Sequence, residues 1–195
     1  GWNIAGKHGV EAHNSPPHHA LAVGKVNYVG DHVAVVIADT KGEADDGAEA
    51  VEVDYEVLTA VVDTATAQDN TIQIHDEAPA NLCYDWEIGD AEATDAAFAD
   101  AAHVSKITID NTRMVVNAME PRAVVGQYDA AAEKFTIHMP TQGVTDARNT
   151  LAKAIFHVAP EKMRVITGDV GGSFGLKIHT YGDEVAATAA SIVLG

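Results

Sequence analysis

The spacing of apolar residues changes several times along the chain, and each change predicts a different element. Residues 1–24 show neither strand nor helix periodicity, which predicts an extended arm. Residues 26–29 and 32–38 are extended segments joined by a turn at Gly30 and Asp31. The second segment is a run of β-branched residues, which is typical of a strand buried on both faces.

A helix and another strand are predicted next. Thr40 stands three residues before Glu43, the spacing of a capping box, so a helix begins there and runs to about Ala50. Residues 51–55 alternate between apolar and polar side chains, as a half-buried strand does. Strand, helix and strand together predict one α/β unit.

The second half of the chain carries a new set of elements. An alanine-rich helix is predicted over Ala91 to Ala102, with extended segments over 104–109 and 122–128. Residues 135–139 and 163–166 have the composition of strands.

Two further helices follow from the same pattern. Thr145 predicts the N-cap of a helix that Pro160 ends, and a last helix begins near Asp183. The apolar positions on one face of the first of these helices are Ala147, Leu151, Ala154, Ile155 and Val158. The whole pattern predicts a mixed fold, α/β or α+β. Its parts are an arm (1–24), a first α/β domain (25–63), a polar linker (64–85) and a second domain (86–195).

Charge and cysteine content exclude several classes of function. Lys and Arg number 12 against 29 Asp and Glu, giving a formal net charge of −17. Such a surface disfavours nucleic acid and anionic membranes, since clustered Lys and Arg bind both. No apolar stretch approaches the ~20 residues of a membrane span. The single cysteine, Cys83, excludes an internal disulfide and an iron–sulfur cluster, and we expect a cytoplasmic protein.

The glycine-rich segment 168–177 is the strongest chemical signal. Its glycines let backbone N–H groups turn outward toward an anionic ligand. The segment is not a P-loop, because Leu176 separates Gly175 from Lys177, and it does not fit the dinucleotide fingerprint. Two interpretations stay open on the pattern alone: a tight structural turn, which the pattern favours, and a phosphate-binding loop.

Other polar groups have simpler interpretations. Glu120 and Arg122 flank a proline between two extended segments, and we expect them to form an ion pair. Thr141 and Gln142 lie between a strand and a helix, where the amide can donate and accept toward a pocket, although a polar loop is the simpler interpretation.

Neither the histidines of the arm nor the cysteine predicts a reactive centre. His13, His18 and His19 fit no zinc spacing. Cys83 has no basic neighbour in the sequence, and the chain lacks a Gly-x-Ser-x-Gly motif. We therefore assign no metal ligand and no catalytic nucleophile.

Five segments carry a family pattern: Gly24 to Ala34, Val51 to Glu56, Asn117 to Arg122, Thr141 with Gln142, and Asp169 to Gly175. In this order they resemble the large, molybdopterin-binding subunit of the molybdenum hydroxylases. This is the xanthine dehydrogenase and aldehyde oxidase family, and aerobic carbon monoxide dehydrogenase is its most similar branch. The resemblance implies the end of an a/b hammerhead domain followed by the first part of a molybdopterin-binding domain.

The resemblance also implies a cofactor site. In the family, the glutamine matching Gln142 points at the molybdenum oxo group. The glycine-rich loop packs against the metal and its pterin dithiolene, and its matching residues here are Gly171, Gly172, Phe174 and Gly175. An amide and backbone donors fix an oxo ligand without adding charge. The family's general-base glutamate would lie beyond the end of the chain, so no catalytic residue is assigned.

Two positions depart from the family pattern. Ser173 stands where the family loop commonly has a third glycine, which reduces the backbone freedom of the loop. Ile178 stands where purine-oxidising members have a glutamate after the loop lysine. The second departure argues against a xanthine-like substrate.

The family implies an oxidoreductase acting on carbon monoxide, an aldehyde or a heterocycle, with water as the oxygen source. Iron–sulfur and FAD subunits are its implied partners. A stand-alone, non-catalytic α/β binding or assembly module is the alternative. Since the family subunit is several times longer, we expect this chain to be an internal piece that is inactive alone and binds no cofactor. We also expect it to self-associate through residues 25–55 or the last helix.

Overall fold

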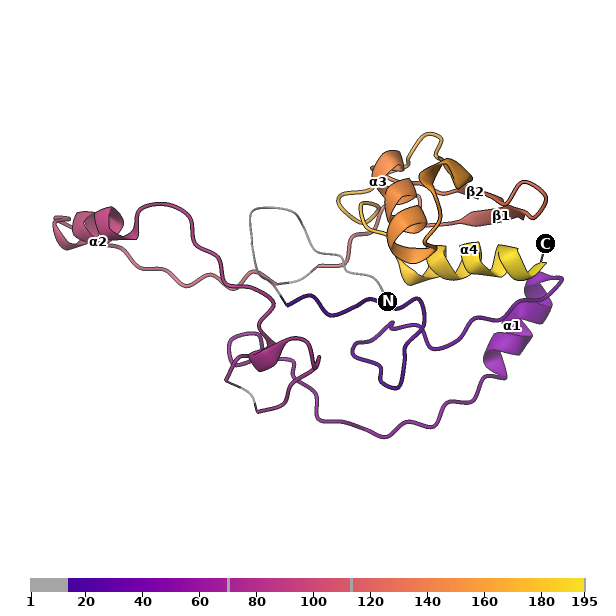
Figure 1. The fold of residues 1–195 in the computed structure, drawn as a ribbon. Helices are drawn as coiled ribbons and strands as arrows, with labels where there is room; N and C mark the ends of the chain where they lie inside the picture. The colour runs from indigo at the N-terminus through magenta and orange to yellow at the C-terminus, as the bar shows by residue number, and fades with distance from the viewer. Residues whose placement is uncertain (1–13, 70, 113, 195) are drawn as a thin grey trace.

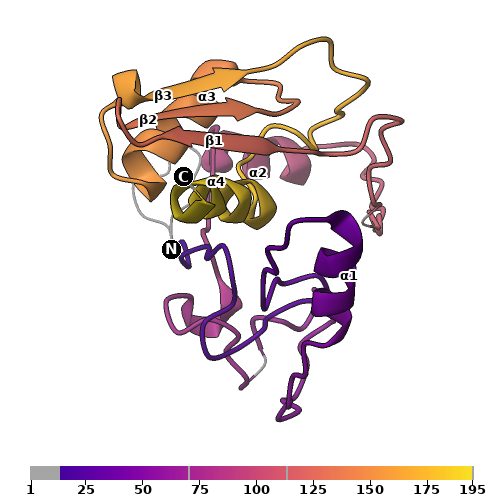
Figure 2. The ribbon, with the colours of Figure 1, turned by 90° about the vertical axis from the view of Figure 1, so that its right-hand side faces the viewer.

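A three-stranded sheet forms the centre of the best-packed part of the chain. The computed structural model describes residues 14–69, 71–112 and 114–194. β1 (Val125–Asp129) pairs antiparallel with β2 (Lys134–His138), and β2 pairs parallel with β3 (Met163–Ile166) (Figure 2). Strands are therefore found where residues 135–139 and 163–166 predict them.

A helical crossover joins the two parallel strands. α3 (Val144–Asn149) continues into the π-helical turn η2 (Thr150–Ile155), and the short 3-10 helix η3 (Pro160–Lys162) leads into β3. The predicted N-cap at Thr145 is wrong, because Gly143 is the capping residue. The Ala147 N–H already bonds to the Gly143 carbonyl at 2.9 Å, so the first turn has formed before Thr145 is reached.

The π-helical turn changes which side chains reach the core. Ala147 and Leu151 are buried as predicted, but Ala152 is buried in place of Ala154, which is exposed. The Phe156 N–H bonds to the carbonyl of Leu151, five residues back, at 2.9 Å. A π turn holds more residues than an α turn, so the side chains within it fall on positions shifted from those of an α-helix.

The core lies between the sheet and its helices. α4 (Gly182–Leu194) packs along β1, and α3 packs against β3 (Figure 1). Alternate residues of β2 and β3 point into this layer, as strand geometry requires. The buried apolar residues are Phe135, Ile137, Met139, Ala147, Leu151, Ala152, Met163, Val165 and Val185.

The first part of the chain differs from its predicted form. α1 (Lys41–Glu49) begins at the predicted capping box of Thr40 and Glu43. Residues 32–38 and 51–55 are extended but belong to no ladder among the described residues. The predicted doubly buried strand is therefore wrong, and the side chain of Val35 is 49% exposed. A strand of this kind is buried only when it pairs with other strands and is covered on both faces, and no described segment pairs with it in a ladder.

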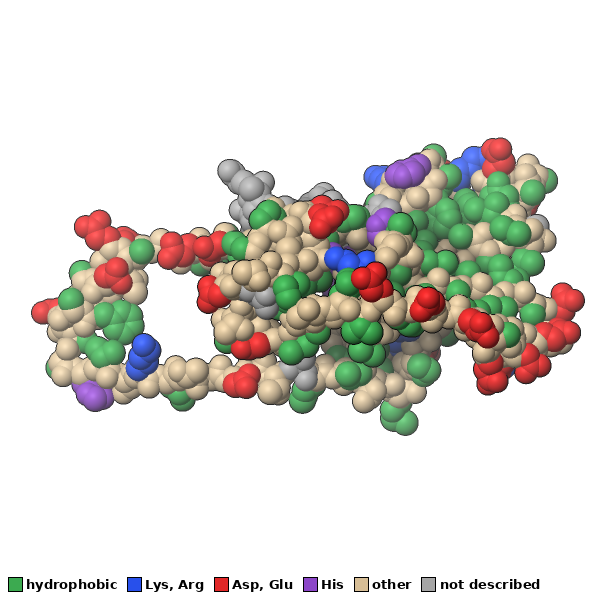
Figure 3. Space-filling view, turned by 90° about the horizontal axis from the view of Figure 1, so that it is seen from below, with side chains coloured by type: hydrophobic (Ala, Val, Ile, Leu, Met, Phe, Trp, Pro, Cys, Tyr) green, Lys and Arg blue, Asp and Glu red, His purple; other side chains and the backbone are tan. Residues whose placement is uncertain are grey.

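A long excursion leaves the packed part between residues 84 and 118 and carries α2 (Ala91–Ala99) at its tip (Figure 1). Asp90 caps the start of this helix and Asp100 is its C-cap, so the helix ends slightly before the predicted limit of Ala102. Acidic side chains gather over α1 and α2 (Figure 3). The predicted linker contains the 3-10 helix η1 (Pro79–Asn81), and no described helix is long and apolar enough to cross a membrane.

A buried carboxylate in α4 makes stability depend on pH. Glu184 is only 2% exposed, and burial raises its pKa to about 7, although the Tyr181 N–H bonds to the carboxylate at 3.0 Å. The folded state therefore binds a proton that the unfolded state releases near pH 4.5. The contribution of Glu184 to stability is greatest below that pH and falls as pH rises toward 7, by roughly 3 kcal/mol at 1.36 kcal/mol per pH unit.

Replacing Glu184 with Gln is expected to flatten this dependence between pH 4.5 and 7, because the amide does not titrate. Urea unfolding at both ends of this range measures the effect. Glu161→Gln, on the exposed turn before β3, is the control and should keep the wild-type slope. A Glu184→Gln variant with the wild-type slope would contradict the assignment.

Candidate functional site

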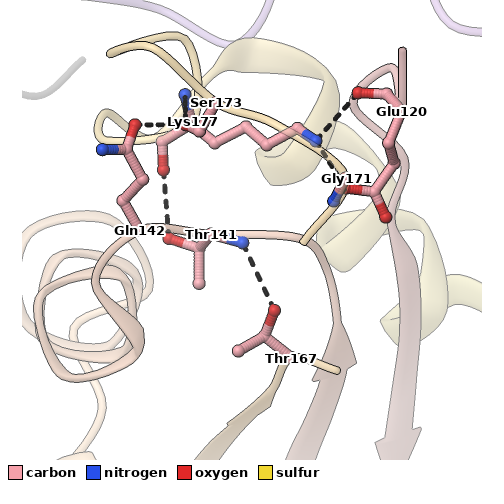
Figure 4. Close-up of polar contacts among 7 residues, drawn as sticks. All are labelled: Glu120, Thr141, Gln142, Thr167, Gly171, Ser173 and Lys177. Atoms are coloured by element: carbon pink, nitrogen blue, oxygen red, sulfur yellow. Dashed lines mark hydrogen bonds and ion pairs between the residues drawn. The ribbon is translucent and has the colours of Figure 1, made fainter. Parts of the chain in front are cut away.

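Three segments that are distant in sequence meet at one edge of the sheet. Because β2 and β3 are parallel, their carboxyl ends lie at the same edge, where Thr141 and the segment 167–177 follow them. β1 runs the opposite way, with Val125 opposite His138, so the residues just before β1 arrive at this edge too. Figure 4 shows these segments in contact.

Gln142 is held against the glycine-rich loop. Its main-chain N–H donates to the Lys177 carbonyl at 3.0 Å. Its side-chain Oε1 accepts from the Gly175 N–H at 3.1 Å and from the Ser173 hydroxyl. The amide oxygen is therefore turned toward the loop, and the amide nitrogen points away from it (Figure 4). Gln142 itself is exposed, so this nitrogen is available as a donor.

A buried lysine fixes the base of the loop. The Lys177 side chain has 0% exposure, and its Nζ donates to the Glu120 carboxylate at 2.6 Å and the Glu120 carbonyl at 2.8 Å. Glu120 Oε2 also accepts from the Gly171 N–H at 2.8 Å. The hydrogen bond from Lys177, and then that from Gly171, lower the pKa of the Glu120 carboxyl. Both ends of the loop are thus tied to the segment before β1.

The predicted Glu120–Arg122 ion pair is wrong. Arg122 instead bonds to Asp183 at 2.8 Å and lies 3.6 Å from the centre of the Tyr181 ring. Residues two apart in an extended segment point to the same face, but the chain bends at Met119 and Glu120, so this spacing does not bring the two side chains together. Arg122 is therefore directed to the start of α4, and Glu120 forms its ion pair with Lys177.

The middle of the loop has an unusual backbone. Gly172 and Gly175 have φ of +102° and +91°, and Phe174 has a φ of +50° although it is not glycine. Phe174 is 79% exposed instead of anchoring a core. The N–H groups of Gly172, Ser173 and Phe174 donate no hydrogen bond to the part of the chain that the structure describes. These groups are therefore available to donate to water or to a ligand.

The structure brings Gln142 and the glycine-rich loop together, but the sequence did not predict the three residues that join them. Glu120, Ser173 and Lys177 carry the hydrogen bonds that join the segments. A signal for Lys177 was present, since a lysine directly after a glycine-rich turn is placed to reach back toward its base. No sequence signal identified Glu120 as its partner.

The other candidates do not form a site in this structure. His13 lies outside the described residues. His18 and His19 belong to no group of three or more His, Cys, Asp or Glu side chains placed to hold a metal, as far as the structure describes the chain. Cys83 is exposed, and Ile178 is 51% exposed.

Comparison with known proteins gives two family matches. Residues 74–195 match the molybdopterin cofactor-binding domain, and residues 3–59 match the a/b hammerhead domain of aldehyde oxidase and xanthine dehydrogenase. The first match covers more than half of the chain. Both agree with the fold class that the resemblance implies.

Two individual relatives agree with these family matches. The chain is 35% identical to the carbon monoxide dehydrogenase large chain of Afipia carboxidovorans, over 90% of this chain and 23% of that one. It is 34% identical to subunit gamma of the 6-hydroxypseudooxynicotine dehydrogenase complex of Paenarthrobacter nicotinovorans, over 91% and 22%.

A solved structure extends the likeness to three dimensions. Reconstituted CO dehydrogenase from Oligotropha carboxidovorans superposes with a TM-score of 0.82 and 34% identity, over 90% of this chain and 23% of that one. The chain thus spans less than a quarter of the length of these relatives. With the family match, this shows that the chain belongs to the molybdopterin cofactor-binding domain family of molybdenum hydroxylase large subunits.

Proposed function

We propose that this protein forms one wall of the cofactor site in the large subunit of a molybdenum-dependent oxidoreductase. The observation that carries the proposal is the meeting of Gln142 with the glycine-rich loop, where an amide nitrogen and three successive backbone N–H groups are left without partners in the described chain. The cofactor-binding residues of the proposal are Gln142, Gly171, Gly172, Phe174 and Gly175. We place the domain limits at 25–63 and 86–195.

The chemistry of this wall fits a molybdopterin-type group. The group brings its own metal ligands in the pterin dithiolene, so the protein need supply only donors and shape. The wall offers neutral N–H donors, and the charges beside it, Glu120 and Lys177, are paired with each other at 2.6 Å. It is also closely packed, since a Cβ added to Gly172 would lie 3.2 Å from the Phe174 ring and 3.3 Å from Ala118 Cβ.

The residues of the chain have three separate tasks in this proposal. When bound, the cofactor supplies two-electron redox chemistry with water as the source of oxygen. The Gln142 nitrogen and the loop N–H groups orient the group by donating hydrogen bonds. Phe174, exposed at the loop, shields the site from water, and the Glu120–Lys177 pair keeps the loop in position.

The proposal includes the rest of an assembly. One relative is a large chain and another is subunit gamma of a complex, which supports partner subunits here. We assign these partners as iron–sulfur and FAD subunits, in the cytoplasm. The substrate class of the proposal is carbon monoxide, an aldehyde or a nitrogen heterocycle. Ile178 in place of a glutamate argues against a purine.

The test is cofactor analysis of the full-length subunit produced with its partners. We expect stoichiometric molybdenum and pterin, together with dye reduction on one of those three substrate classes. The 195-residue chain alone should hold neither. A folded, assembled subunit free of molybdenum and pterin would contradict the proposal, and so would full occupancy in the short chain.

A further inference from the structure

The Ser173 hydroxyl joins the loop lysine to the glutamine. Its Oγ donates to Gln142 Oε1 and accepts from the Lys177 N–H at 3.1 Å (Figure 4). A hydroxyl carries one proton, and the Lys177 N–H occupies an acceptor position on the same oxygen. The proton of Ser173 is therefore left for Gln142.

We infer that Ser173 is a positioning residue that fixes which end of the Gln142 amide faces outward. The inference rests on the proposed function and deepens it. A glutamine amide has two ends of nearly equal size, an acceptor oxygen and a donor nitrogen. In the observed orientation the oxygen accepts from both Ser173 and Gly175, whereas a flipped amide would set one of its N–H groups against the Gly175 N–H, which cannot accept. The nitrogen is thus held on the outer side.

Without the Ser173 hydroxyl, the preference for the amide orientation with the nitrogen outward becomes weaker. The Gly175 N–H, at 3.1 Å, is then the remaining contact on Gln142 Oε1. Gln142 is exposed, so water can satisfy either end of its amide. The flipped orientation becomes populated, and a fraction of the molecules presents an oxygen where the cofactor needs a donor.

Contacts around Ser173 hold its hydroxyl in one position. Lys177 donates its main-chain N–H to Ser173 while its buried Nζ is bonded to Glu120. Gly171 is bonded to the same carboxylate at 2.8 Å. The orientation of Gln142 therefore depends on a chain of contacts that begins in the segment before β1. This contact needs a hydroxyl at a position where the family loop commonly has glycine.

The experiment uses the assembled, full-length enzyme and a double-mutant cycle. We compare Ser173→Ala, Gln142→Ala, the double variant and the conservative Ser173→Thr, which keeps the hydroxyl. Ser105→Ala is the matched control, because it also removes a hydroxyl bonded to a side chain, that of His103 at 3.1 Å, but on the excursion. Readouts are molybdenum content, kcat and KM separately, and the Mo(V) EPR signal in H2O and D2O.

We expect Ser173→Ala to keep its molybdenum, to lower kcat roughly three- to tenfold with KM nearly unchanged, and to alter the EPR signal. Ser173→Thr should restore kcat and signal, and Ser105→Ala should match the wild type. On the Gln142→Ala background, Ser173→Ala should add almost nothing, because it acts through that amide.

Each other outcome overturns the inference. An unchanged kcat and EPR signal in Ser173→Ala would show that the hydroxyl does not position the Gln142 amide. Additive effects in the double variant, or loss of molybdenum in Ser173→Ala, would show that Ser173 acts on the loop and not through Gln142. In these cases the proposed function stands if the wild type holds the cofactor. A wild type without molybdenum overturns both together.

Discussion

Replacing Lys177 with Met is expected to lower the free energy of unfolding by about 2–4 kcal/mol. Methionine fills the space of the lysine stem but has no charge. The fully buried Nζ donates two hydrogen bonds, to the carboxylate and the carbonyl of Glu120. Their loss leaves both acceptors without this donor and releases the base of the loop. Urea unfolding at neutral pH measures the change.

Lys162→Met is the control for this variant. Lys162 makes the same two kinds of contact, to the Ala132 carbonyl at 3.0 Å and the Glu133 carboxylate at 3.3 Å, but its side chain is 39% exposed. Exposed pairs contribute ~0–1 kcal/mol, so this variant should remain near the wild type. If both variants lowered the free energy of unfolding by the same amount, the burial of Lys177 would not make its contacts more stabilising than those of Lys162.

Replacing Gly172 with Val is expected to reduce the molybdenum content of the assembled enzyme at least about tenfold. The φ of +102° is strained for any residue with a side chain. The added Cβ would also meet the Phe174 ring at 3.2 Å and Ala118 Cβ at 3.3 Å. The exposed loop therefore moves, and its N–H groups no longer point where the proposal needs them.

Gly168→Val separates this effect from a general effect of bulk. Gly168 lies in the same segment, but a Cβ added there meets nothing within 4 Å, and its φ is not in the strained region. Its molybdenum content should equal that of the wild type. If Gly172→Val retained full molybdenum, the loop would have no part in holding the cofactor.

The position of the site follows from topology that the sequence contains. Residues 135–139 and 163–166 are predicted strands with a helix between them, and such a unit gives parallel strands whose carboxyl ends meet. Gln142 follows the first strand and the glycine-rich loop follows the second. The proximity of Gln142 and the glycine-rich loop could therefore be predicted from the sequence.

The partners inside the site were not predictable in the same way. Glu120 lies two residues from Arg122 and 57 residues from Lys177, yet it pairs with Lys177. The choice depends on the start of α4, where Asp183 and, just before the helix, Tyr181 lie beside Arg122. The residues around Glu120 do not indicate where α4 lies. The prediction therefore paired Glu120 with the nearest opposite charge, Arg122, which is the wrong partner.

The errors in the first part of the chain have another cause. The β-branched run 32–38 has the composition of a buried strand, but burial needs neighbours on both sides. The capping box at Thr40 and Glu43 is satisfied within four residues and was predicted correctly. Short-range chemistry was readable from the sequence, whereas the pairing of a strand depends on the segments available to it.

The most direct test of the central claim is a high-resolution density map of the assembled enzyme with its cofactor bound. The account predicts the cofactor within hydrogen-bond distance, about 3 Å, of the Gln142 amide nitrogen and of N–H groups between Gly172 and Phe174. A cofactor bound at another face, with Gln142 and this loop turned to solvent, would contradict it.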